Sequence, residues 1–120
     1  MSSYILFRNQ TYAETLANMT GANICDDESR LSGIDPQDGD VVIMDAHYAG
    51  NMLDLSGIQN VRKLQKYECK GKDVKFKILS WFPSEWFDEK SNLKFQKEKL
   101  YSRYHVEFIQ LPISDVKLLT

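Results

Sequence analysis

The feature that most constrains the fold is the segment of residues 41–45, where four apolar residues run directly into an aspartate. Val41, Val42 and Ile43 are β-branched, and an apolar run this short is typical of a strand buried on both faces. In sheets of parallel strands, ligands bind at the edge formed by the carboxyl ends of the strands. Asp45 therefore stands where either a functional carboxylate or a loop anchor is expected.

Apolar runs and amphipathic segments alternate along the rest of the chain. The first helix is expected to begin at a capping box formed by Thr11 and Glu14 and to end at Gly21. Alternation of this kind predicts an α/β protein with a parallel sheet and helices on both faces. Besides 41–45, the expected strands are residues 4–7, 22–25, 74–80 and 106–110, and the expected helices are 12–20, 55–66, 84–104 and 114–119, with a short helix at 29–34.

Length and composition exclude several classes of protein. The 120 residues fit one domain spanning residues 1–120, and a net charge of -2 with dispersed Lys and Arg argues against a nucleic-acid-binding surface. There is no apolar run of membrane-spanning length and no secretory signal. Cys25 and Cys69 lack partners at zinc spacing, which favours a reduced, cytoplasmic setting, and we expect Cys25 to be a buried thiol and Cys69 a surface thiol. Because the chain stops inside an apolar-periodic segment, we also expect it to be the N-terminal part of a longer protein.

Four segments, taken in order, resemble the receiver domain of two-component response regulators. The strand ending in Asp45 resembles the one that ends in the phosphorylated aspartate, and residues 55–58 resemble the turn that opens the third helix. Residues 78–80 place Ser80 at the position of a switch hydroxyl, and residues 108–113 resemble the last strand and its Lys-Pro ending. The resemblance implies a doubly wound, flavodoxin-like sheet of five parallel strands in the order 2-1-3-4-5, here with a shortened second helix. It also implies a cis peptide bond before the proline.

The chain departs from the family's usual site. In the family, acids after the first strand bind Mg²⁺, which offsets the charge on the phosphoryl group, and a lysine pairs with that group. Here Arg8 and Asn9 occupy the acid positions, and Leu111, before Pro112, occupies the lysine position. We therefore expect a degenerate receiver, or pseudo-receiver: a signalling and protein-interaction module with no enzymatic activity, no cofactor and no metal. In this hypothesis Asp45 is an anchor paired with Arg8 or with a loop N–H.

Two alternatives remain open. In the first, the chain is a working receiver that a histidine kinase phosphorylates on Asp45, with Ser80 as the switch hydroxyl and Mg²⁺ held with the help of Asp26 or Asp27. In the second, it is a small flavodoxin-like nucleotide- or flavin-binding domain. The absence of a glycine-rich phosphate loop argues against that function. We expect His47 to be a solvated loop residue rather than a ligand or a proton donor.

Aromatic residues are dense after Ser80, and they either fill the core under the last helices or form a partner-binding surface. Receiver domains dimerise through the face of the fourth helix, fifth strand and fifth helix, which begins near this segment. The resemblance thus implies protein partners, such as a histidine kinase or an output domain in the same chain, or a homodimer, with no membrane and no direct nucleic-acid partner. The candidate surface comprises Trp81, Phe82, Trp86, Phe87 and Tyr104, whereas Lys63, Lys66, Lys70 and Lys72 are expected to be solvated.

Overall fold

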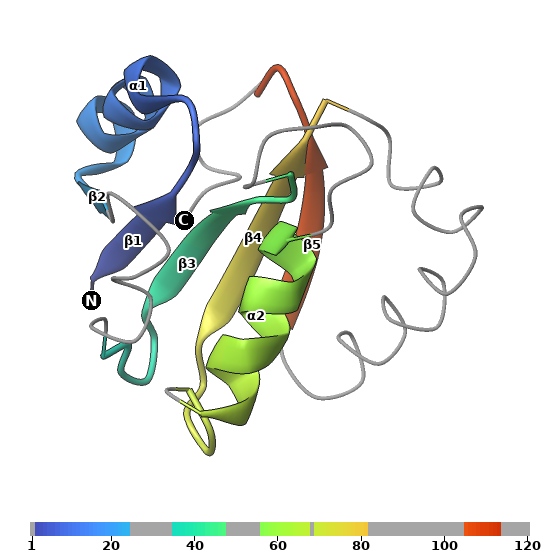
Figure 1. Ribbon diagram of the computed structural model, residues 1–120. Helices are drawn as coiled ribbons and strands as arrows, with labels where there is room; N and C mark the ends of the chain where they lie inside the picture. The colour runs from blue at the N-terminus through green and yellow to red at the C-terminus, as the bar shows by residue number, and fades with distance from the viewer. Residues whose placement is uncertain (1, 25–34, 48–55, 68, 82–104, 114–120) are drawn as a thin grey trace, which may run out of the picture.

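The computed structural model describes residues 2–24, 35–47, 56–67, 69–81 and 105–113. Its strands form one parallel sheet with the order β2-β1-β3-β4-β5 (Figure 1). The predicted fold class and strand order are therefore confirmed. The segments expected to form the shortened second helix and the helices at 84–104 and 114–119 lie outside the described residues. The described elements are β1 (Ser3–Leu6), α1 (Gln10–Thr20), β2 (Asn23–Ile24), β3 (Val41–Asp45), α2 (Ser56–Lys66), β4 (Lys75–Ser80) and β5 (His105–Gln110).

The central position in the sheet belongs to β3, as its composition predicts. It pairs with β1 on one side and with β4 on the other. Successive side chains of a strand point to opposite faces. Accordingly, Val42 and Met44 lie in one buried cluster, whereas Val41 and Ile43 lie in another. A strand that is apolar on both faces can be accommodated only in the interior of a sheet covered on both sides.

Two hydrophobic cores lie on the two faces of the sheet. On one face, α2 contributes Ile58, Val61 and Leu64, which are at helical spacing and at most 2% exposed. Figure 1 shows α2 lying across β3 and β4. On the other face, α1 contributes Ala13 and Leu16. Burial of each large side chain stabilises the fold by roughly 1.5–3 kcal/mol.

Neither of the two described helices is long and apolar enough to cross a membrane.

The start of α1 differs from the prediction. The capping box at Thr11 is wrong: the N-cap is Asn9, whose Oδ1 accepts a hydrogen bond of 3.0 Å from the backbone N–H of Tyr12. The earlier start brings the Tyr12 ring to 5.1 Å from the ring of buried Phe7. Packing of Phe7 against the helix thus selects between two residues that both suit a cap. The predicted end is confirmed, because Gly21 adopts the left-handed conformation (φ 74°).

Candidate functional site

Asp45 ends β3 at the carboxyl edge of the sheet, with the ends of β1 and β4 on either side. Its half-exposed carboxylate accepts two backbone hydrogen bonds. Oδ1 accepts from His47 at 2.9 Å, which closes a tight turn, and Oδ2 accepts from Arg8 at 3.4 Å, which is long for such a bond. Asp45 therefore ties together the two loops that leave β1 and β3. The Arg8 side chain is exposed, and its pairing with the carboxylate stays a prediction.

Arg8 and Asn9, which the sequence resemblance aligns with the family's acids, follow the carboxyl end of β1. Arg8 contributes the backbone N–H just described. Asn9 uses its side-chain oxygen to cap α1. The chemical role of Asn9 in this structure is thus to satisfy a helix N–H group.

Ser80 and His47 form a contact that the sequence interpretation missed. Nε2 of His47 lies 2.9 Å from Oγ of Ser80, and Ser80 is only 3% exposed. The expectation that His47 is a solvated loop residue is therefore wrong. Sheet register explains the contact, because Asp45 pairs with Leu79 and the turn after Asp45 must lie beside Ser80. A bond of 3.0 Å from the backbone N–H of Ala46 to the carbonyl of Leu79 holds the turn there.

The segment that resembles the family's third-helix turn packs directly on the end of β3. The N–H of Gly57 donates to the carbonyl of Ala46 at 3.1 Å. A Cβ atom at residue 57 would overlap the carbonyl oxygen of Asp45. Glycine is therefore required at this position by the close approach of two backbones.

The residue that the sequence resemblance aligns with the family's lysine, Leu111, is an apolar core residue. Leu111 is 3% exposed and belongs to the core cluster on the α1 face of the sheet. Its backbone N–H donates to the carbonyl of Ser80 at 2.7 Å. The peptide bond between Leu111 and Pro112 is cis, which confirms that prediction.

An aromatic group borders the same edge of the sheet. The Trp81 ring is 6.3 Å from that of Tyr12, which in turn contacts Phe7. Burial raises the pKa of the Tyr12 hydroxyl. Trp81 itself remains 58% exposed. The other members of the candidate surface (Phe82, Trp86, Phe87 and Tyr104) and the acids Asp26 and Asp27 lie outside the described residues.

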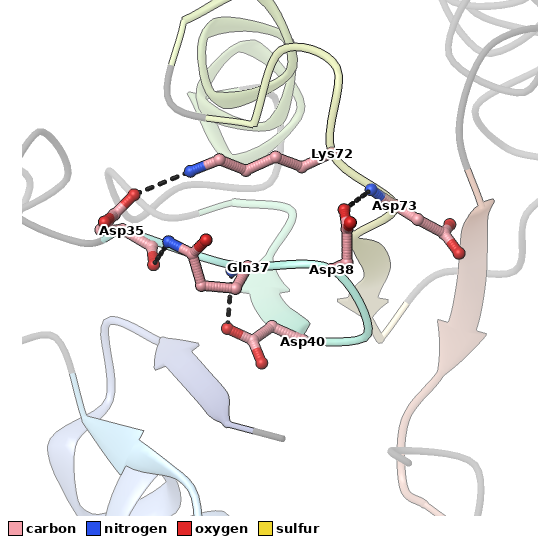
Figure 2. Close-up of polar contacts among 6 residues, drawn as sticks. All are labelled: Asp35, Gln37, Asp38, Asp40, Lys72 and Asp73. Carbon is pink, nitrogen blue, oxygen red and sulfur yellow. Dashed lines mark hydrogen bonds and ion pairs between the residues drawn. The ribbon is translucent and has the colours of Figure 1, made fainter.

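A second polar cluster occupies the opposite edge of the sheet, before β3 and β4 (Figure 2). Buried Asp40 accepts backbone hydrogen bonds of 2.8 Å from Ser2 and from Gln37. Asp38 accepts one of 2.8 Å from the backbone of Asp73. The bonds from Ser2 and Asp73 join segments distant in sequence, and the bond from Gln37 closes a local turn, so the role of the cluster is structural.

The basic turn after α2 contributes to this cluster. Lys72 forms an ion pair of 2.8 Å with Asp35, and its side chain is only 28% exposed. Lys63, Lys66 and Lys70 are exposed, as predicted, whereas Lys72 is half-buried and paired. Cys69, expected at the surface, is instead fully buried in the core beneath α2, and Cys25, expected to be buried, lies outside the described part of the chain. Within the described ranges, no group of three or more His, Cys, Asp or Glu side chains is arranged to hold a metal ion.

Comparison with known proteins gives a structural neighbour. No protein-family model matches the chain, and no curated protein matches it. Among solved structures, a response regulator from Colwellia psychrerythraea is similar, with a TM-score of 0.66 and 16% sequence identity. The match covers 98% of this chain and 89% of that one. At this identity the likeness establishes the fold: the chain has a receiver-like, flavodoxin-type sheet.

Proposed function

We propose that this chain is a pseudo-receiver, a protein-interaction module in cytoplasmic signalling in which Asp45 is a fixed anchor rather than a phosphoacceptor. The observation that carries the proposal is the burial of Leu111. Leu111, which the sequence resemblance aligns with the lysine that pairs with the phosphoryl group, is only 3% exposed and fills the core. A phosphoryl group adds about 1.5–2 negative charges, so the missing cation removes a large part of its stabilisation.

The environment of Asp45 supports the same function. The backbone N–H groups of His47 and Arg8 already point at its two carboxylate oxygens. The acid positions hold Arg8 and Asn9, and Asn9 is engaged at the start of α1. A divalent cation prefers several oxygen ligands, often carboxylates. These substitutions therefore favour an anchor over an Mg²⁺-dependent acceptor.

We propose that the protein partner binds the surface around the exposed indole of Trp81. This indole is 58% exposed, and Tyr12 supports it from α1. Aromatic side chains that are both exposed and held in place are frequent anchors of protein interfaces. A kinase or an output domain of the same chain is the class of partner that the receiver-like fold favours.

The experiment is incubation with acetyl phosphate and Mg²⁺ followed by intact-mass measurement. We expect no stable adduct, whereas a phosphoryl adduct located on Asp45 would contradict the proposal. Asp45→Asn is the matched control for modification elsewhere. The paired variant Arg8→Asp with Asn9→Asp restores the acids of the family, and any gain of adduct in it identifies these positions as the reason for the loss.

One observation favours the alternative of a working receiver. The carboxylate of Asp45 is half-exposed at an edge that also contains the hydroxyl of Ser80. If a histidine kinase phosphorylates this site, Mg²⁺ must bind nearby. A titration with Mg²⁺ should then shift the amide signals of Asp45 and Ala46, whereas in a pseudo-receiver these signals stay in place.

A further inference from the structure

We propose that His47 is a positioning residue that takes the part a phosphoryl group plays in a working receiver: it holds the hydroxyl of Ser80, and with it the end of β4, in one arrangement. The inference rests on the proposed function and deepens it. In a pseudo-receiver, which is not phosphorylated, the hydroxyl at the switch position has no phosphoryl group to bind. The structure places the imidazole of His47 there, 2.9 Å from Oγ.

Burial makes this contact consequential. Ser80 is 3% exposed, and buried polar groups are almost always hydrogen-bonded. Either tautomer of the imidazole can satisfy the bond, because Nε2 accepts the hydroxyl proton or Nε2–H donates to Oγ. Displacing the hydroxyl toward Asp45 therefore requires breaking or replacing a buried hydrogen bond. Such a loss changes an equilibrium by about 3- to 10-fold.

The imidazole is delivered by a turn that is itself held in place. The backbone N–H of His47 donates to Oδ1 of Asp45 at 2.9 Å, and Ala46 donates to the carbonyl of Leu79 at 3.0 Å. Both bonds use backbone atoms of the turn. A prearranged side chain loses less conformational entropy when it binds. By anchoring this turn, Asp45 thus also orients His47, the residue that contacts the hydroxyl of Ser80.

Ser80 links this contact to the candidate interaction surface. The next residue, Trp81, lies beside Tyr12 and is exposed. The carbonyl of Ser80 accepts the N–H of Leu111 at 2.7 Å, which joins the ends of β4 and β5. A shift of Ser80 would therefore move both Trp81 and the end of β5. In this proposal, the hydrogen bond from His47 holds Ser80 in its observed position.

The test uses two substitutions of His47 that keep its backbone N–H. His47→Gln places an amide nitrogen where Nε2 stands, whereas His47→Asn matches the nearer ring nitrogen and falls short of Ser80. We expect His47→Asn to raise the hydrogen-exchange rate of the Leu111 amide, which donates to the carbonyl of Ser80, by about 3- to 10-fold, the loss of one buried hydrogen bond. His47→Gln should restore rates near those of the wild type. In Ser80→Ala, His47→Asn should add nothing further.

A spectroscopic measurement approaches the same contact from the other side. In the wild type, the ¹⁵N shift of His47 Nε2 should move on Ser80→Ala, and that of the second ring nitrogen should move less. Trp81 fluorescence, recorded with the second indole of the chain removed by Trp86→Phe, should change with His47→Asn and recover with His47→Gln. This measurement keeps the proposal testable even if His47→Asn does not fold.

Three results would overturn the proposal. The first is equal exchange rates in His47→Gln and His47→Asn. The others are a further rate increase on adding His47→Asn to Ser80→Ala, and a ¹⁵N shift of His47 Nε2 that does not change on Ser80→Ala. Failure of the proposed function is a separate result. A phosphoryl adduct on Asp45 of the wild type contradicts the pseudo-receiver. In that case, rescue by His47→Gln still establishes His47 as the residue that positions Ser80.

Discussion

The backbone of Gly57 packs so closely on Asp45 that a Cβ atom at residue 57 would overlap the carbonyl oxygen of Asp45. The first turn of α2 is thereby fixed on the end of β3. The turn at Ala46 and His47, which contacts the end of β4 at Leu79 and Ser80, lies at the same edge of the sheet. The spacing between this helix and the central strand therefore determines the geometry of the whole candidate site.

Gly57→Ala should destabilise the protein by about 1–3 kcal/mol, the usual cost of overpacking. This direction is opposite to the intrinsic preference, because Ala in a helix is favoured over Gly by about 1 kcal/mol. Urea unfolding followed by circular dichroism measures the change. Gln59→Ala, at an exposed position of the same helix, is the control and should stay within about 0.5 kcal/mol of the wild type. Equal stability of both variants would show that the backbones can separate without cost.

Asp40→Ala should lower the free energy of unfolding by about 2–3 kcal/mol. It removes the buried carboxylate that accepts from two backbone N–H groups, those of Ser2 and Gln37. Asp38→Ala removes one acceptor at an exposed position and should cost about 0.5–1 kcal/mol. Thermal or urea unfolding of the two variants side by side gives the comparison. The assignment of Asp40 as the main anchor of this edge fails if the order of the two costs is reversed.

The ion pair between Asp35 and Lys72 predicts a pH dependence. The hydrogen bond and charge of Lys72 lower the pKa of Asp35 below its usual 3.8, and the hydrogen bond from Asp35 raises the pKa of Lys72 above 10.5. The contribution of Asp35 is present above its unfolded pKa and is lost as the pH falls through its lowered folded pKa. That of Lys72 is present below its unfolded pKa and is lost as the pH rises through its raised folded pKa. The pair therefore contributes a constant, small stabilisation across neutral pH.

Lys72→Met should return the pKa of Asp35 toward 3.8, since the lowering comes mainly from Lys72. Carboxyl ¹³C shifts followed by NMR from neutral to acid pH report this directly. An Asp35 midpoint that does not move would indicate that the ion pair does not persist in solution.

Trp81→Ala should leave the fold largely intact, because the indole is 58% exposed, while weakening binding to a protein partner. It should also lower the pKa of Tyr12 toward 10.0, since burial is what raises it. Subtracting the ultraviolet titration curve of Tyr12→Phe isolates this hydroxyl. As the pH rises past 10, the unfolded chain loses the Tyr12 proton first, so stability falls there in the wild type and falls less in Trp81→Ala. An unchanged Tyr12 pKa would mean that other groups provide the burial.

Local patterns in the sequence were sufficient for the elements themselves. The apolar run of β3 and the spacing of Ile58, Val61 and Leu64 in α2 indicate burial directly, because periodicity depends only on neighbouring residues. Gly21 indicated the end of α1 because a left-handed helix end also depends on the local residue type. Predicting the strand order also required the family resemblance, because the residues of one segment do not determine which other strand it pairs with.

The tertiary structure alone decided the contacts that make up the site. His47 and Ser80 are 33 residues apart and meet only because β3 and β4 are adjacent and in the observed register. The choice of Asn9 over Thr11 as a cap depended on the packing of Phe7 against Tyr12. Contacts between distant segments depend on which strands pair and how closely backbones approach. The sequence by itself therefore determined which residues form the sheet and its helices, whereas the three-dimensional packing decided what those residues hold in place.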